Sequence, residues 1–234
     1  SIVYNDGTKR RNPNELIFFI LNKLQDELNK KNYNDINNNE NPDTHNIQAV
    51  INCGMNNFKN SNDSIISNTL NWFQIKESMC NKCYKLMYNF NAFTTFELDI
   101  LGCAKSKQNQ IITINDCLNY YIIKKKHILF CSNCKNYTQI TYQTKILHSP
   151  EIFIFSLDRG QIDLNLLNIK VLFEEDLDMS LYVENQTTSP KHYKLIGIVS
   201  ITKNYDYCSF CKSNYDNKWY FYKDDIASPH ELKN

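Results

Sequence analysis

Two pairs of cysteines constrain this chain more than any other feature of its sequence. The motif CNKC places Cys80 and Cys83 three residues apart, and the motif CSNC does the same for Cys131 and Cys134. A structural zinc ion needs four ligands at tetrahedral corners, and two short turns that each present two thiolates supply them. The sequence therefore predicts one structural zinc in a zinc ribbon with a long insert. Four separate buried cysteines are the alternative interpretation.

The remaining five cysteines show no such pattern. Cys208 and Cys211 lie in a predicted strand, where residues three apart point to opposite faces, so we do not expect them to share a metal. Cys53, Cys103 and Cys117 are expected to be small buried residues. The total of nine is odd, and no segment resembles a secretory signal. This combination favours a reducing compartment, so we expect an intracellular protein, cytoplasmic or nuclear.

Composition excludes several classes of protein. The 234 residues are enough for one large domain or two small ones, and 42% of them are hydrophobic, as in ordinary globular proteins. The formal net charge is only +1, whereas a nucleic-acid binder usually has a basic surplus. No apolar run reaches the length of a membrane span. We therefore expect neither direct nucleic-acid binding nor a membrane segment.

The first part of the chain is predicted to be helical. Residues 12–31 have helical periodicity, with Asn12, Pro13 and Glu15 as start signals. Residues 32–46 are Asn-rich and aperiodic, which predicts a solvated loop. A shorter helix is expected over residues 63–72, with Ile65, Ile66 and Leu70 turned inward. The stripe of the long helix is expected to pack on the core, and its members are Leu16, Ile17, Ile20, Leu24 and Leu28.

Strand patterns dominate the rest of the chain, so the predicted class is α+β. One short helix interrupts them over residues 116–121, with Thr113 as its cap. The segment EIFIFSL is almost continuously apolar, which predicts a strand covered on both faces. The strands are expected at residues 96–101, 151–157, 193–201, 208–211 and 218–223.

An ordered set of motifs resembles the catalytic domain of the ubiquitin-specific proteases, the papain-like USP/UCH deubiquitinases. The motifs are NPNELIFFILNKLQDELN (12–29), MCNKC, TINDCLNYY (113–121), FCSNC, SPEIFIFSLDR (149–159), FEEDLDMSLYV (173–183) and YKLIGIVS (193–200). The resemblance implies a right-hand fold of thumb, palm and zinc-tipped fingers, with the first part of the thumb missing. On that basis the chain is a single domain, 1–234. Residues 1–72 are the late thumb with the loop 32–46, 73–140 the fingers and 141–234 the palm.

The resemblance also assigns roles to the final strands. In YDYCSF, Asp206 stands at the family's catalytic histidine, and Tyr207 follows it at the wall of the ubiquitin-tail cleft. In KWYFYKDD, Lys223 stands at the acid that orients this histidine, and Asp224 is the next acid. An aspartate, with a pKa near 4, is a poor replacement for a base that must work near neutral pH. A lysine would repel an imidazolium instead of stabilising it.

The nucleophile is also missing from its expected context. The family cysteine lies in an Asn-x-x-Asn-Thr-Cys segment upstream of the first helix, whose acidic start is replaced here by Asn12. His192 cannot act as the base, because YKLIGIVS fixes it one strand too early. The resemblance thus implies an inactive family domain that binds ubiquitin, a ubiquitinated protein or other members of a larger complex. The alternatives are an active thiol hydrolase whose cysteine segment lies upstream, and a zinc-ribbon interaction module unrelated to ubiquitin.

Overall fold

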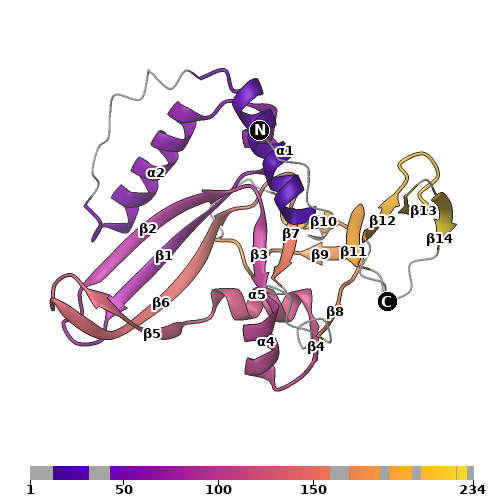
Figure 1. Cartoon of the computed structure of the whole chain (residues 1–234). Helices are drawn as coiled ribbons and strands as arrows, with labels where there is room; N and C mark the ends of the chain where they lie inside the picture. The colour runs from indigo at the N-terminus through magenta and orange to yellow at the C-terminus, as the bar shows by residue number, and fades with distance from the viewer. Residues whose placement is uncertain are drawn as a thin grey trace, which may run out of the picture. The chain divides into compact units, whose positions relative to one another are not determined.

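The computed structural model describes residues 13–31, 43–158, 169–184, 190–201, 207–224 and 226–230. Its helices and strands confirm the predicted α+β class (Figure 1). The chain divides into two compact units. The first comprises Ser1–Leu28 and Ile196–Lys233, and the second comprises Asn29–Leu195 with Asn234. Each unit is described by itself. In the described ranges, no helix has both the length and the apolar character needed to cross a membrane.

A long antiparallel sheet dominates one side of the second unit. Its strand order is β2 (Leu86–Phe93), β1 (Trp72–Cys80), β6 (Asn136–His148) and β5 (Lys125–Cys131). The turn from β1 to β2 and the turn from β5 to β6 lie at the same free end of the sheet (Figure 1). Because each turn carries one CxxC motif, the strand register brings the two cysteine pairs together.

Helix α2 (Ile47–Ser61) covers part of this sheet and was not expected from the sequence. Its N-cap, Asn46, accepts hydrogen bonds from the amides of Gln48 and Ala49. The ring of Phe58 meets that of Phe73 edge-on, with centroids 4.9 Å apart. The helix was missed because its sequence is largely polar and directly follows the Asn-rich stretch, so the helical periodicity of its apolar residues was not recognised.

Helix α3 (Ile65–Leu70) is shorter than predicted. Ser64 caps it, and the chain enters β1 at Trp72. Ile66 and Leu70 are buried as expected, but Ile65 is 61% exposed. That part of the prediction is wrong because consecutive helical positions point about 100° apart, so Ile65 turns away from the side that buries Ile66 and Leu70.

The main core of the second unit surrounds two parallel strand pairs. Strand β3 (Phe96–Asp99) pairs with β7 (Phe155–Asp158), and β4 (Ile111–Thr113) pairs with β8 (Lys170–Leu172). Phe96, Leu98 and Ile100 are fully buried. The predicted strand 96–101 is too long, because Asp99 accepts a hydrogen bond from the Gly102 amide and starts helix α4 (Ile100–Lys107).

Helix α5 (Ile114–Ile122) confirms the predicted cap at Thr113. The Thr113 hydroxyl accepts from the Asp116 amide, and the Asp116 carboxylate accepts from the Thr113 amide. Strand β7 begins only at Phe155, so the observed strand is shorter than the expected strand 151–157. It is half-buried, and not covered on both faces as predicted. Before it, the Ile152 amide donates to the carbonyl of Thr69 and not to a neighbouring strand.

The segment 193–201 forms two strands instead of one. Strand β10 (His192–Lys194) pairs with β9 (Asp176–Asp178), whereas β11 (Gly197–Ile201) pairs with β12 (Tyr207–Lys212). The Leu195 amide donates to Glu175, and the carbonyl of Ile196 accepts from Lys212. The chain therefore changes partners between Leu195 and Ile196, and hydrophobicity alone does not show such a change.

The first unit contains helix α1 (Pro13–Leu28) and an antiparallel sheet in the order β11, β12, β13 (Trp219–Lys223), β14 (Ile226–His230). The predicted strands 208–211 and 218–223 are confirmed. The helix is also confirmed, but the prediction that its stripe packs on the core is wrong. Helical periodicity shows which side is apolar, not that another element covers it. No α1 residue is buried, and exposed members of the stripe include Leu16, Ile20, Leu24 and Leu28. Asn12 and residues 32–42 lie outside the described residues.

Candidate metal centre and active-site strands

The four cysteines of the two CxxC motifs meet at the free end of the long sheet. Their sulfur atoms all lie within 4.8 Å of one another. The Sγ atoms of Cys80 and Cys134 are 3.8 Å apart, and those of Cys83 and Cys131 are also 3.8 Å apart. Both distances far exceed the about 2.05 Å of a disulfide bond. The geometry therefore holds four separate thiols at one point.

This spacing fits a tetrahedral zinc ion. With Zn–S bonds of about 2.3 Å, the edge of a tetrahedron of sulfurs is about 3.8 Å. Both of the cross-pair distances have this value. Cys80 and Cys131 are almost completely buried, and Ile140 packs with them. Four thiols without an open corner would make a closed structural site and not a catalytic one.

The two turns have the same local geometry. Tyr84 and Lys135 each follow the second cysteine of a motif, and both have left-handed backbone angles, with φ values of 58° and 52°. The Tyr84 amide donates to the Cys80 carbonyl over 2.8 Å. The Cys134 amide donates to the Cys131 sulfur over 3.4 Å. Each turn thus folds tightly enough to point both thiols inward.

The surroundings shift the pKa values of Cys80 and Cys134 in opposite directions. The Thr138 hydroxyl lies 3.2 Å from the Cys80 sulfur, and this contact, with backbone amides, lowers the pKa of Cys80 to about 6. Burial, with the neighbouring thiols, raises the pKa of Cys134 to about 12. Zinc binds thiolates, so loading would release the remaining protons. Thr138 was missed in the sequence, since only the register of β1 and β6 places it beside Cys80.

The other described cysteines do not join this cluster. Cys208 is buried and Cys211 is exposed, which agrees with the prediction that they point to opposite faces of their strand. Cys103 and Cys117 are buried, as expected, and burial raises the pKa of Cys117 to about 12. A thiol with so high a pKa is a poor nucleophile. Cys53, expected to be buried, is half-exposed on α2.

The strands that the resemblance aligns with an active site lie in the first unit. Strand β12 begins at Tyr207 and strand β13 ends at Lys223. Because Ser209 pairs with Tyr222 in these antiparallel strands, Tyr207 and Lys223 lie at the same end of the pair. Burial raises the pKa of the Cys208 thiol, and the positive charge of Lys223 offsets part of that rise. Asp224 follows in a left-handed turn with φ 50°. Asp206 lies outside the described residues.

His192 lies in a different sheet. It starts β10, its side chain is 79% exposed, and its Nδ1 atom is 3.7 Å from a carboxylate oxygen of Asp178. This position agrees with the interpretation that it is a surface residue.

Comparison with known proteins identifies the family. A model of the family "Ubiquitin carboxyl-terminal hydrolase" matches residues 4–233. Ubiquitin carboxyl-terminal hydrolase 15 of Homo sapiens is 27% identical over 158 residues, which cover 62% of this chain and 16% of that protein. Ubiquitin carboxyl-terminal hydrolase 12 of Saccharomyces cerevisiae is also 27% identical over 158 residues, with 59% and 12% covered. The chain thus spans about one sixth or less of the length of these relatives.

Solved structures show the same fold. In the SAGA Ubp8/Sgf11/Sus1/Sgf73 DUB module bound to ubiquitin aldehyde, a chain matches with a TM-score of 0.64 and 20% identity, covering 96% of this chain and 46% of that one. A yeast SAGA DUB module with a variant Sgf73 matches with a TM-score of 0.63 and 19% identity, covering 94% and 47%. The family match over residues 4–233 and this shared fold lead to one conclusion: the chain belongs to the ubiquitin carboxyl-terminal hydrolase family.

Proposed function

We propose that this domain binds ubiquitin or a ubiquitinated protein without hydrolysing it, as part of a larger complex. The observation that carries the proposal is the cation at the end of β13. Lys223 stands where the family resemblance expects an acid, and it lies at the strand end that also holds Tyr207. A cation there opposes an imidazolium on the neighbouring strand, and the sequence has Asp206 and not histidine beside it.

The zinc cluster supports a binding role. The residues Cys80, Cys83, Cys131 and Cys134 would hold the ion, which would fasten two hairpins to each other at their tips. The ion supplies structure and no open ligand position. Two rigid hairpins present a fixed surface, and a fixed surface loses less entropy on binding than a mobile one.

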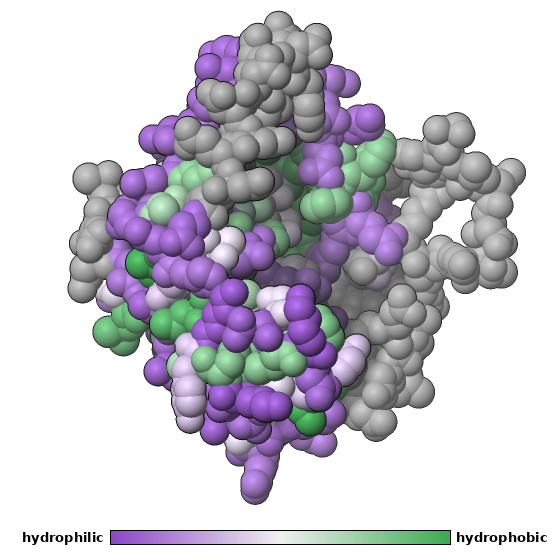
Figure 2. Space-filling view, turned by 90° about the vertical axis from the view of Figure 1, so that its left-hand side faces the viewer, coloured by the Kyte–Doolittle hydropathy of each residue, from purple (hydrophilic) through white to green (hydrophobic). Residues whose placement is uncertain are grey.

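An apolar surface lies next to this cluster. Ile128, Phe130 and Tyr137 are 73%, 57% and 71% exposed. They share one face of the β5–β6 pair, where the Phe130 and Tyr137 rings meet edge-on with centroids 5.8 Å apart. Figure 2 looks onto this end of the sheet and shows green apolar side chains exposed among purple polar ones. We infer that this face contacts the folded part of ubiquitin.

Strand β5 offers a matched test of binding. Leu129 points to the opposite face from Ile128 and is also exposed, at 46%. Titration of labelled mono-ubiquitin should show that Ile128→Asp weakens binding about tenfold or more, as expected for an interface anchor. Leu129→Asp should leave binding within about twofold, with zinc content unchanged in both variants. Equal effects of the two substitutions would refute the assignment of this face.

A second experiment tests inactivity. The chain should not turn over ubiquitin that carries a C-terminal fluorogenic group, because loss of a general base alone typically removes a factor of about 10² to 10⁴. The double substitution Asp206→His with Lys223→Asp should not rescue it, since neither residue supplies a thiolate. In a longer form that carries an upstream cysteine segment, the same pair should increase activity.

One observation favours the alternative of an active thiol hydrolase. The matched relatives are named hydrolases, and this chain spans only a small part of each. Turnover by a longer form with Asp206 and Lys223 unchanged would support that alternative. The proposal would be rejected if these 234 residues turned over the substrate and if substitution of a described cysteine outside the zinc cluster abolished that turnover. Those cysteines are Cys53, Cys103, Cys117, Cys208 and Cys211.

A further inference from the structure

One face of the sheet β2–β1–β6–β5 carries positive charge and no carboxylate from its own strands. Phe73 of β1 points to the face that α2 covers, whereas the side chain of Gln74 accepts a hydrogen bond from Tyr121 of α5 on the opposite face (Figure 1). Because side chains alternate along a strand, Lys76 also lies on this α5 face and Glu77 does not. Glu77 is the only acidic residue in the four strands.

Two lysines on the α5 face stack on tyrosine rings. The Nζ atom of Lys76 lies 4.1 Å from the centre of the Tyr142 ring on β6. The Nζ atom of Lys125, on β5, lies 3.7 Å from the centre of the Tyr120 ring on α5. Lys125 is the cross-strand partner of Tyr142, so the two stacked pairs are neighbours. Because an aromatic face attracts a cation, the two ammonium groups are held in place before any ligand binds.

These two cations have no carboxylate partner in the described part of the chain. Neither ammonium group forms an ion pair or a hydrogen bond there, whereas Lys145 on the opposite face is paired with Glu184. Burial lowers the pKa of Lys125, and the charge of Asp99 offsets part of that effect. The Asp99 carboxylate already accepts a hydrogen bond as the cap of α4. Half-burial of a cation without a counter-ion costs free energy, and an anionic ligand would remove that cost.

Further hydrogen-bond donors surround the two cations. The hydroxyl groups of Tyr120 and Tyr142 form no hydrogen bond with other described residues. Burial raises the pKa of both hydroxyls, so they stay protonated and can donate. His127 is exposed on the same face, and its ring centre lies 5.3 Å from that of Tyr142. Ammonium groups and free hydroxyl donors together are complementary to carboxylates.

We infer that the α5 face binds an acidic segment of a partner protein, whose carboxylates contact the two lysines and the two tyrosine hydroxyls. Strands β1 and β5 flank β6, so the backbones that carry the lysines are about 10 Å apart. A segment with several carboxylates spans that width more readily than one small anion does. A nucleic acid fits less well, because its binding usually needs a larger basic surplus than a net charge of +1. Ubiquitin binding is a separate matter, because Ile128 lies on the opposite face.

Fluorescence anisotropy with a fluorescein-labelled peptide of alternating glutamate and serine tests the site. We expect saturable binding that weakens with added salt, because salt screens the attraction between opposite charges. A peptide of alternating lysine and serine should not bind. The double substitution Lys76→Gln with Lys125→Gln should weaken binding of the acidic peptide about tenfold, since two partly enclosed charge pairs are lost.

Two further sets of variants separate specific contacts from general attraction. Lys126 is exposed at the next position of β5 and points to the opposite face, so Lys126→Gln is the matched control for Lys125→Gln. The control should leave binding within about twofold, whereas Lys125→Gln should weaken it several-fold. Lys76→Arg with Lys125→Arg keeps both cations on their tyrosine rings and should retain most of the binding. All variants should keep the zinc content and the ubiquitin affinity of the wild type.

Three results would overturn the proposal. Equal losses from Lys125→Gln and Lys126→Gln would mean that the peptide responds only to the overall positive charge. Wild-type affinity in the double glutamine variant would exclude both lysines from the contact. Tighter binding of a fluorescein-labelled oligouridylate at the same salt concentration, lost in the double glutamine variant, would indicate a nucleic-acid site instead. A loss of ubiquitin binding in Ile128→Asp with the acidic peptide still bound would support two independent surfaces.

Discussion

The two four-stranded sheets of this protein retain different parts of a family design. The sheet β2–β1–β6–β5 carries four cysteines whose sulfurs have the spacing that tetrahedral zinc requires. The sheet β11–β12–β13–β14 has the expected strands and aromatic residues, and the family resemblance aligns Lys223, at the end of β13, with an acid. Under the proposed function, the first sheet keeps the structural chemistry of the family, whereas the second does not supply its acid–base chemistry. We infer that the fold is maintained for binding.

The two sheets also differ in burial. In the first, Ile75 and Ile146 are completely buried. In the second, Cys208 and Trp219 keep 8% and 6% of their surface exposed, and Val199 keeps 51%. Burial of apolar surface is the main source of stability. We therefore expect most of the free energy of unfolding to reside in the second unit, which contains the first sheet.

Loss of zinc should have the largest effect. Structural zinc contributes on the order of 10 kcal/mol of apparent binding free energy in small zinc domains. Cys131→Ser, or exhaustive chelation, should abolish hydrogen-exchange protection at the free ends of β5 and β6 but leave Leu98 in β3 protected. Elemental analysis should give about one zinc per chain before the change. A zinc-free protein with normal protection at those ends would contradict the assignment.

Truncation of a core side chain should lower the free energy of unfolding by several kcal/mol more in the second unit than in the first. Leu98 is completely buried in β3, so Leu98→Ala should lower the free energy of unfolding by about 2 to 5 kcal/mol. Val199→Ala in β11 should cost less than about 1 kcal/mol, because half of that side chain is already exposed. Denaturant unfolding followed by tryptophan fluorescence measures both. Equal losses would mean that the two units share one cooperative core.

The sequence predicted those parts of the protein that depend on local spacing. Each CxxC pair, the Thr113 cap and strand β13 follow from residues close together in the chain, and the structure agrees with them. The end of β3 at Asp99 was missed, because its carboxylate acts as a cap only once the following turn forms. The exchange of partners after Leu195 was missed as well, since it depends on distant strands.

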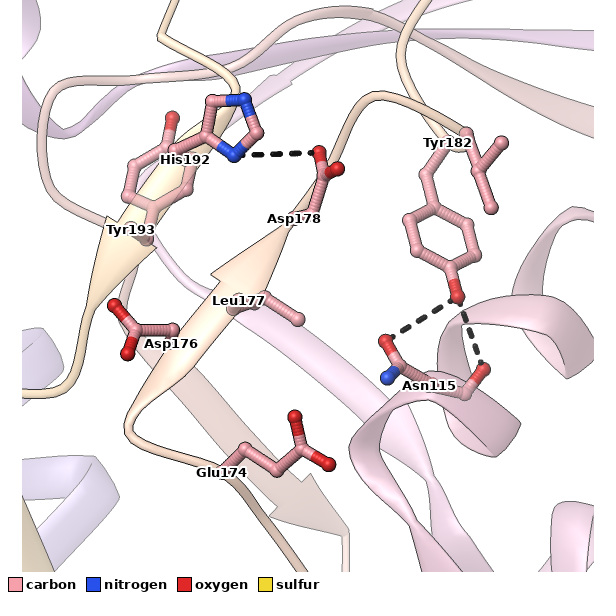
Figure 3. Close-up of a pocket in the computed structure, with 9 residues that line it drawn as sticks. Asn115, Glu174, Asp176, Leu177, Asp178, Tyr182, His192 and Tyr193 are labelled. Carbon is pink, nitrogen blue, oxygen red and sulfur yellow. Dashed lines mark hydrogen bonds and ion pairs between the residues drawn. The ribbon is translucent and has the colours of Figure 1, made fainter.

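The sites that were missed depend on tertiary structure. Thr138 reaches Cys80 across two paired strands, and no motif marks it. The pocket beside β9 and β10 (Figure 3) includes Asn115 of α5, which lies at least 60 residues earlier in the chain. The packing of the α1 stripe was predicted wrongly, because periodicity identifies an apolar side without identifying the element that covers it.

Removal of a helix cap should have an intermediate effect. Thr113→Ala should destabilise the second unit by about 1 kcal/mol, because two amides at the start of α5 lose or weaken their hydrogen bonds. Tyr220→Phe removes a part-buried hydrogen bond to Asp216 in the first unit and should have a smaller effect. Thermal unfolding of the two variants provides the comparison. A larger loss from Tyr220→Phe would reverse the inferred distribution of stability.

The ion pair at the same helix should make stability depend on pH. Burial tends to raise the pKa of Asp116, but hydrogen bonds from Lys107 and Thr113 outweigh it and leave that pKa below its ordinary value. A lowered pKa stabilises the folded state above the unfolded pKa of about 3.9, and this contribution disappears as pH falls through the folded value. The stability difference between wild type and Asp116→Asn should thus be constant near pH 7 and shrink below about pH 4. A difference that persists at pH 2 would exclude ionisation as its cause.

The smallest effect should come from the backbone of the cysteine turns. Lys135 has a left-handed φ of 52°, a conformation that glycine adopts without steric cost. Lys135→Gly should stabilise the zinc-loaded protein by no more than about 1 kcal/mol, because relief of strain is partly offset by the greater freedom of glycine when unfolded. Lys82→Gly, inside the other motif but without a positive φ, is the matched control and should destabilise. Zinc competition with a chromogenic chelator, measured for both variants, distinguishes them. Weaker zinc retention by Lys135→Gly than by Lys82→Gly would show that the lysine side chain, and not the backbone angle, determines that turn.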